Sequence, residues 1–137
     1  MEKILVDSCI FIDIFRGNTQ LYQDLLKQKV LLSSIVHMEL IQGARDKIEL
    51  EKIDKFLKKF KVFPITQKIS KKSMELIKTY SISHGLLIPD ALIAATAIIK
   101  NFPLWTFNQK DFRFISDLAL YVAGDKSGEK SEKINLQ

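Results

Sequence analysis

Near the start of the chain, three apolar residues are followed by an acid in the stretch Ile4-Leu5-Val6-Asp7. A short apolar run of this kind is typical of a buried strand, and residues 8–15 continue with a helical pattern. A second apolar run, Val30-Leu31-Leu32, leads into Ser33-Ser34, which suits the N-cap of a helix over residues 35–44. Buried strands separated by helices indicate an α/β fold with a parallel sheet.

The same alternation continues through the rest of the chain. Gly85 suits the end of one helix, and Pro89 suits the first turn of the next. Helices are predicted at about 21–27, 48–60, 70–84 and 90–100, and strands at 62–65, 104–106 and, at an edge of the sheet, 119–122. We therefore expect one domain over residues 1–123, with the polar residues 124–137 as a flexible tail.

The composition bounds the class of protein. With 137 residues, of which 47% are hydrophobic and 27% charged, the chain is long enough for one buried core. Neither a secretory signal nor a membrane-spanning stretch is predicted, and the single cysteine, Cys9, cannot form an internal disulfide. We therefore expect a cytoplasmic protein, with Cys9 as a small buried hydrophobe. The net charge of +5 suits binding to a polyanion, although lysines at helical spacing equally suit an ordinary solvated surface.

Four acids stand beside apolar segments, namely Asp7, Glu39, Asp90 and Asp111. Burying a carboxylate costs free energy unless a cation, hydrogen-bond donors or a helix N-terminus compensates it. Asp7 follows the first predicted strand, and Asp111 follows the strand that ends at Thr106. Ligands of an open parallel sheet bind beyond the carboxyl ends of its strands, so the four acids are placed to meet there.

Each acid also has a purely structural interpretation. Asp7 and Asp90 suit helix N-caps. Glu39 suits a solvent-facing helix position, and Asp111 suits a cap with Asn108. A shared site instead explains all four at once. Oxygen ligands without Cys or His favour Mg²⁺ or Mn²⁺, and such ions assist phosphodiester hydrolysis.

Four motifs carry a resemblance to a known family. They are Val6-Asp7-Ser8, Glu39-Leu40-Ile41-Gln42-Gly43-Ala44, Pro89-Asp90-Ala91-Leu92-Ile93-Ala94-Ala95-Thr96-Ala97 and Thr106-Phe107-Asn108-Gln109-Lys110-Asp111-Phe112. With this order and spacing, over residues 3 to about 122, the chain resembles the PIN domain, and specifically the small VapC-type ribonuclease toxins of bacterial and archaeal toxin–antitoxin pairs. The resemblance implies a PIN-like three-layer α/β/α sandwich with a central, mostly parallel sheet of four to five strands.

The resemblance also implies an activity. It implies a metal-dependent endoribonuclease in which a metal-activated water attacks phosphorus and leaves a 5′-phosphate, with Mg²⁺ as the cofactor and Mn²⁺ as a substitute. The implied catalytic and metal-binding acids are Asp7, Glu39, Asp90 and Asp111, and the implied supporting residues are Ser8, Thr106 and Asn108. Ser8 stands where such proteins often have threonine, and Cys9 where asparagine is frequent. Asp117 is a second candidate for the role of Asp111.

Partners are implied as well. They are RNA as substrate, a second copy of the chain in a homodimer, and a VapB-like antitoxin that wraps the toxin and enters its groove; no membrane is implied. Phe11, Ile14 and Phe15 suit the antitoxin contact if they are exposed, and core packing if they are buried.

On the residues alone, three other functions compete with this one. A catalytically silent PIN-like module would bind RNA or a protein without cleaving it. A receiver-like domain would need an acceptor Asp ending a middle strand, and Phe63-Pro64-Ile65-Thr66 offers none. Metal-free cleavage would need His37 and His84 to act together as base and acid.

Overall fold

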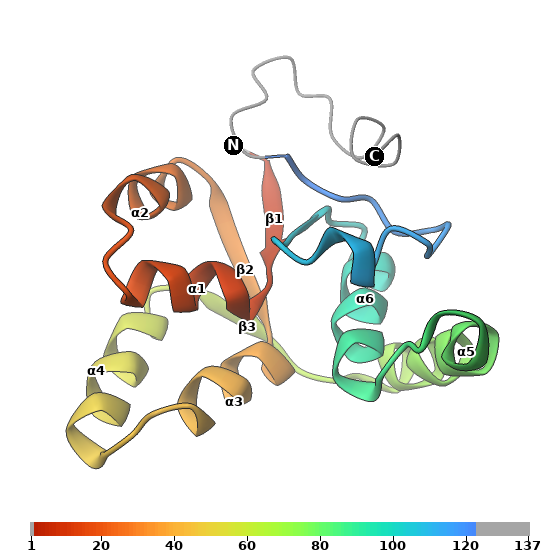
Figure 1. Ribbon diagram of the computed structural model, residues 1–137, viewed down its shortest axis with the longest axis horizontal. Coiled ribbons are helices and arrows are strands. Elements are labelled where there is room, and N and C mark those ends of the chain that lie inside the picture. The colour runs from red at the N-terminus through yellow and green to blue at the C-terminus, as the bar shows by residue number, and fades with distance from the viewer. Residues whose placement is uncertain (1, 123–137) are drawn as a thin grey trace.

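Strands and helices alternate along residues 2–122, which are the residues that the computed structural model describes (Figure 1). The strands are β1 (Lys3–Val6), β2 (Lys29–Ser33), β3 (Lys61–Phe63) and β4 (Leu104–Trp105). The helices are α1 (Ser8–Phe15), α2 (Thr19–Leu26), α3 (Ser34–Gln42), α4 (Lys47–Leu57), α5 (Gln67–His84) and α6 (Ile88–Lys100), and a 3₁₀ turn, η1, spans Gln109–Asp111. Within the described residues, none of these helices has the length and apolar character needed to cross a membrane. The expected tail, 124–137, lies outside the described residues.

The four strands form one parallel sheet in the order β3-β2-β1-β4. β1 is central, because Leu5 pairs with Leu31 of β2 on one side and with Leu104 of β4 on the other. The three apolar residues of β1 are completely buried, as expected for a strand covered on both faces. Since all strands run the same way, the residues that follow β1, β2 and β4 lie at one edge of the sheet.

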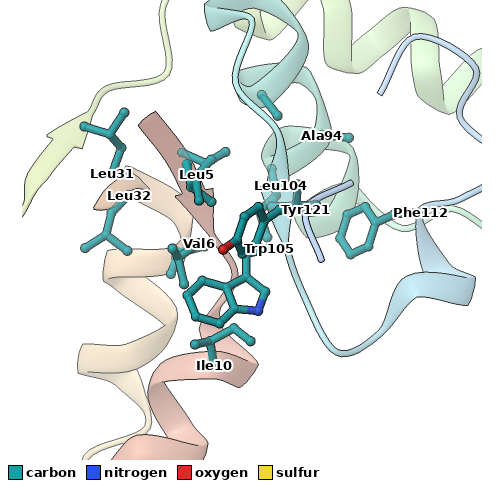
Figure 2. Packing of buried hydrophobic residues seen from close by; sticks show 14 of the residues in the cluster. Leu5, Val6, Ile10, Leu31, Leu32, Ala94, Leu104, Trp105, Phe112 and Tyr121 are labelled. Carbon is teal, nitrogen blue, oxygen red and sulfur yellow. The ribbon is translucent and has the colours of Figure 1, made fainter. Parts of the chain in front are cut away.

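Helices cover both faces of this sheet. In Figure 1, α1 to α4 lie on one side of the strands and α5 and α6 on the other, and α5 packs along α6. The predicted three-layer α/β/α arrangement is therefore confirmed. Figure 2 shows the core beside β1 and β4, where the rings of Trp105 and Tyr121 meet edge to face with centroids 5.3 Å apart. Burial of this apolar surface is the main favourable contribution to folding.

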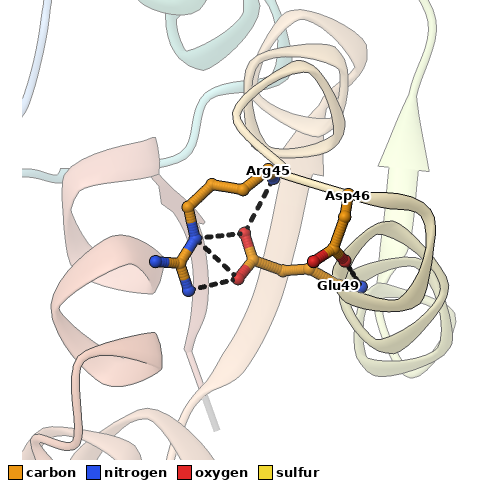
Figure 3. Close-up of polar contacts among 3 residues, drawn as sticks. All are labelled: Arg45, Asp46 and Glu49. Atoms are coloured by element: carbon orange, nitrogen blue, oxygen red, sulfur yellow. Dashed lines mark hydrogen bonds and ion pairs between the residues drawn. The ribbon is translucent and has the colours of Figure 1, made fainter.

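Side chains cap several helices at their first turn. The predicted cap of α3 is present, because Ser33 Oγ accepts a hydrogen bond of 3.3 Å from the Val36 N–H. Asp46 caps α4 in the same way, by accepting a hydrogen bond of 2.8 Å from the Glu49 N–H (Figure 3). Such caps satisfy N–H groups that have no partner inside the helix.

Two predicted caps are absent. α6 begins at Ile88 without a side-chain cap, and Asp90 lies within its first turn rather than before it. Asn108 stands at the N-cap position of η1, yet its side chain makes no cap hydrogen bond and only its carbonyl oxygen accepts one, from the Asp111 N–H. The capping interpretation therefore does not account for either Asp90 or Asp111.

The predicted edge strand at 119–122 does not form within the described residues. Leu120 makes one isolated parallel bridge to Leu104, supported by hydrogen bonds from Leu104 N–H to Ala119 O (2.9 Å) and from Tyr121 N–H to Leu104 O (2.8 Å). β4 is only two residues long, so it offers no further backbone groups for a ladder. The sheet accordingly has four strands, the lower of the two predicted numbers.

An aromatic cluster joins α1 to α4. Phe11 is completely buried, and its ring centroid lies 6.3 Å from that of Phe56 and 5.7 Å from that of Phe60. Phe15 contacts the same cluster but is 40% exposed. Core packing is therefore the correct interpretation of Phe11, while Ile14 is half-buried and Phe15 still presents apolar surface to solvent.

Candidate active site

Polar side chains from several elements gather at the carboxyl edge of the sheet. Asp7 directly follows β1, and Thr106 directly follows β4. Glu39 lies in α3, Asp90 in the first turn of α6, and Asp111 at the end of η1. The negative charges of the other three acids all act on Asp90, so the structure brings the four predicted acids into one neighbourhood.

Asp7 is the most firmly held of the four. Its side chain is buried, with Oδ1 accepting a hydrogen bond of 2.8 Å from the Ser8 N–H and Oδ2 accepting one of 2.8 Å from the Thr106 hydroxyl. Thr106 Oγ1 accepts in turn from the Asn108 N–H at 3.0 Å. Asp7 therefore caps α1, as its structural interpretation predicts, and it also links α1 to the end of β4.

Cys9 belongs to the same network, which the sequence did not predict. Its Sγ lies 3.7 Å from Asp7 Oδ2 and 3.5 Å from Thr106 Oγ1, and it accepts a hydrogen bond of 3.3 Å from the Phe107 N–H. Burial, and then the charge of Asp7, raise the pKa of this thiol, so it stays protonated at neutral pH. The expectation of a merely hydrophobic side chain is incorrect. The signal in the sequence was its place two residues after Asp7, in the first turn of the helix that this acid caps.

Asp90 carries the largest electrostatic cost in the site. Burial, followed by the charges of Asp7, Asp111 and Glu39, raises the pKa of Asp90 from 3.8 to about 6. An acid in the first turn of a helix is ordinarily favoured in its charged form, so burial and repulsion together outweigh the helix dipole here. Ala94, one turn further along α6, is completely buried and leaves the acid no polar partner on that side.

Glu39 is half-buried, and burial and the charge of Asp7 raise its pKa as well. A hydrogen bond with the Ser8 side chain opposes that shift. Its Oε1 is nevertheless buried without a hydrogen-bond partner. The solvent-facing interpretation of Glu39 therefore fails, because a buried acceptor without a donor is costly unless a ligand completes it.

Other candidate residues are placed differently. Asp111 and Asn108 are both exposed at the border of the site. Asp117 instead forms an ion pair with Lys72 of α5 at 3.5 Å, which favours Asp111 as the fourth acid. His84 stacks on Phe114 with centroids 4.3 Å apart, and no contact between His37 and His84 occurs in the described part of the chain.

The arrangement fits a divalent cation by its chemistry. Within residues 2–122, no Lys or Arg forms an ion pair with any of the four acids, and the orphaned Glu39 Oε1 and the raised pKa of Asp90 both indicate uncompensated negative charge. Carboxylate and hydroxyl oxygens are the ligands that Mg²⁺ and Mn²⁺ prefer. In the same residues, however, no three His, Cys, Asp or Glu side chains are already arranged to ligate an ion. The residues fit such an ion in kind, and their side chains must adjust to bind it.

Comparison with known proteins places this site in context. The PIN domain family model matches residues 4–117. The chain is 32% identical over 123 residues to ribonuclease VapC1 of Methanocaldococcus jannaschii, covering 88% of this chain and 87% of the relative. It is also 32% identical over 120 residues to ribonuclease VapC19 of Mycobacterium tuberculosis, covering 83% of this chain and 95% of the relative.

Solved structures show the same likeness. A chain of a toxin–antitoxin complex from Klebsiella pneumoniae superposes with a TM-score of 0.72 at 32% identity, covering 84% of this chain and 94% of that chain. A chain of VapBC2 from Rickettsia felis, bound to a DNA fragment from the promoter of the pair, also superposes with a TM-score of 0.72, at 28% identity over 85% of this chain and 95% of that chain. Both alignments span nearly the whole of the described fold.

Proposed function

This chain belongs to the PIN-domain family, and from that premise we propose that it is a metal-dependent endoribonuclease acting as the toxin of a type II toxin–antitoxin pair. The observation that carries the proposal is the group of four acids at the carboxyl edge of the sheet, where burial and then the charges of the other three acids raise the pKa of Asp90. Relatives named ribonucleases share about a third of the sequence over most of its length.

In this proposal Asp7, Glu39 and Asp90 hold the principal ion, and Asp111 completes the site. The ion is Mg²⁺, with Mn²⁺ as a substitute. When bound, a divalent ion polarises a phosphoryl oxygen and lowers the pKa of coordinated water, which is the chemistry that phosphodiester hydrolysis needs. Asp111 is exposed, so it is the acid best placed to meet RNA as it enters from solvent.

The chain's own residues prepare the site for this chemistry. The Thr106 hydroxyl and the Ser8 N–H fix both oxygens of Asp7, which keeps one carboxylate in place whether or not other ligands are bound. Asp90 holds a proton for part of the time near pH 6 and must release it from its carboxyl oxygen before it can act as a ligand. Until the charge is compensated, the acids repel phosphate, so RNA binding is coupled to cation binding.

We also propose the partners of this activity. The substrate is RNA in the cytoplasm, the chain forms a homodimer, and a VapB-like antitoxin neutralises it. Support for an antitoxin comes from the related chain that was solved in a toxin–antitoxin complex. The exposed apolar surface of α1, at Ile12 and Phe15, suits a contact of this kind.

Cleavage of RNA by the purified chain tests the proposal. A mixed RNA pool is incubated with Mg²⁺ or Mn²⁺, with chelator, and with the Asp90→Asn variant in place of the wild type. We expect cleavage that requires metal, ends in 5′-phosphates and is lost in Asp90→Asn. Asp46→Asn, which removes a carboxylate from the exposed start of α4 and keeps a capping side chain, is the matched control and should cleave normally.

The alternative function is a silent PIN-like module that binds RNA or a protein without cutting. Wild-type protein that binds RNA but leaves it intact with every metal would establish that alternative. Cleavage that persists in chelator would instead point to metal-free chemistry and to the histidines.

A further inference from the structure

An exposed aromatic side chain stands at the border of the acid site. Phe107 is 53% exposed and directly follows Thr106, whose hydroxyl lies 2.8 Å from Asp7 Oδ2. The ring of the exposed Phe15 contacts the rings of Phe11 and Phe56, whereas Phe107 has no ring contact among the described residues. Phe107 therefore presents apolar surface to solvent without the packing that explains Phe15.

The backbone that carries this ring is held on both sides. The Phe107 N–H donates a hydrogen bond of 3.3 Å to Cys9 Sγ, and the next N–H, of Asn108, donates one of 3.0 Å to Thr106 Oγ1. Cys9 and Thr106 both contact Asp7 as well. The backbone that carries the ring is thus hydrogen-bonded to the same network as the central acid, so binding a ligand there does not require this segment to be ordered first.

The surroundings favour a nucleobase over a phosphate at this position. In the described residues none of the four acids is paired with Lys or Arg, so the site repels a phosphate that has no cation beside it. Leu87 and Ile88, which come just before Asp90 in the chain, are each 68% exposed. Apolar borders around a charged centre suit a ligand with a charged backbone and flat apolar faces, which describes single-stranded nucleic acid.

We propose that Phe107 stacks on the base of the nucleotide next to the scissile phosphate and that it thereby selects single-stranded RNA. This inference rests on the proposed ribonuclease function and deepens it. Bases inside a duplex are already stacked on one another, and only an unpaired base can offer its face to the ring. Because Phe107 adjoins Thr106 along the chain, a base on its ring lies beside the phosphate at the acids.

Kinetics on a short single-stranded RNA test the role of the ring. Phe107→Ala should raise KM by about tenfold, since loss of one base–aromatic stack costs that order of affinity, and should change kcat by less than about threefold. Phe107→Trp should restore KM, whereas Phe107→Leu, which is apolar but not aromatic, should not. Met74→Ala on α5, at a similarly exposed side chain (57%), is the matched control and should behave as wild type.

Binding without cleavage separates this inference from the proposed function. RNA carrying 2-aminopurine beside an uncleavable linkage at the cleavage position is titrated with wild-type protein and Mg²⁺, and stacking quenches its fluorescence. We expect quenching that is lost in Phe107→Ala. Equal KM and equal quenching with and without the ring would overturn the role of Phe107 even if the chain cleaves RNA. Quenching that depends on Phe107 in a chain that never cleaves would uphold stacking and refute the nuclease.

Discussion

Two groups of acids in this molecule have opposite electrostatic environments. At the start of α4, Glu49 accepts hydrogen bonds from the Arg45 backbone N–H (3.0 Å) and from its guanidinium (2.8 Å to Nη2), and Asp46 caps the helix (Figure 3). The Arg45 hydrogen bonds lower the pKa of Glu49. At the carboxyl edge of the sheet, by contrast, burial and like charges raise the pKa of Asp90 to about 6.

The difference indicates what each group does. The hydrogen-bond partners of the α4 acids all lie within a few residues along the chain. These acids therefore require no ligand, and they stabilise the helix. The acids at the sheet edge come from distant segments, repel one another and leave Glu39 Oε1 without a partner. A group of like charges that repel one another and are partly buried is a candidate site for a compensating ligand.

The largest expected effect is a loss of activity in variants of the sheet-edge acids that variants of the α4 acids do not show. If the chain is the proposed ribonuclease, Asp7→Asn should lower kcat/KM by about 100-fold or more, because it removes one charge from the group that holds the ion. Glu49→Gln should leave kcat/KM unchanged. Steady-state cleavage of one RNA by both variants makes the comparison, and an equal loss in both would mean that the sheet-edge acids have no special role.

Metal binding should stabilise the folded protein through the acids at the sheet edge and not through the acids of α4. We expect Mn²⁺ or Mg²⁺ at a hundredfold excess over Kd to stabilise the wild type by about 2.7 kcal/mol against thermal unfolding. Glu49→Gln should show the same rise in Tm, while Asp90→Asn should show much less. Calorimetry with and without chelator measures the change in Tm. A rise in Tm that Asp90→Asn retains in full would place the ion elsewhere.

The pH dependence of stability should differ in sign between the groups. The native pKa of Asp90, about 6, is above its ordinary value of 3.8, so the native state binds more protons between these values and stability falls as pH rises through that window. Without metal, Asp90→Asn should therefore be more stable than wild type by about 1–2 kcal/mol at pH 7.5, a value reduced for partial solvent access. Urea unfolding at pH 7.5 and at pH 3.5 tests this, since the gain should vanish at the lower pH.

Cys9 tests how far the site depends on its supporting network. Cys9→Ala removes the acceptor for the Phe107 N–H and should cost about 1 kcal/mol of stability. It should also reduce kcat several-fold by loosening the Thr106 loop, whereas Cys9→Ser keeps a hydrogen-bonding atom and should retain more of both. Denaturant unfolding and single-turnover cleavage measure the two effects. If alanine and serine behave alike, packing rather than hydrogen bonding explains Cys9.

The smallest expected effect on stability is that of the ion pair between Arg45 and Glu49 at the start of α4. Because the pKa of Glu49 is lowered, its contribution to stability is present above the ordinary value of 4.5 and is lost as pH falls. Glu49→Gln should lower Tm slightly at pH 7 and not at all near pH 3, and high salt should erase the difference because the pair is exposed. A large loss at pH 7 would show that this pair is more than a surface feature.

Local pattern predicted much of this molecule. Apolar runs and cap residues foretold the order of strands and helices, and the Ser33 cap and the Gly85 stop are present as expected. The acids Asp7, Glu39, Asp90 and Asp111 were singled out because each stands next to an apolar segment. Their catalytic and metal-binding roles stay predictions, to be tested by the variants above.

Local sequence patterns did not predict the long-range contacts. The burial of Phe11 depends on rings of α4, and the failed strand at 119–122 depends on the short length of β4. The choice of Asp111 over Asp117 depends on Lys72, which is far from both in the sequence. In each case the deciding partner lies on another element, and spacing along the chain carries no information about it.

The sequence by itself therefore determined the parallel α/β order and the identity of the acids, because strand, helix and cap preferences act over a few residues. Only the tertiary structure decided how the acids meet. It joined Cys9 to Thr106 and Asp7 across the sheet and left Glu39 Oε1 without a partner, and it raised the pKa of Asp90 by burying that acid and by bringing like charges together. Burial and Coulomb repulsion depend on distances in space, and those distances exist only once the chain has folded.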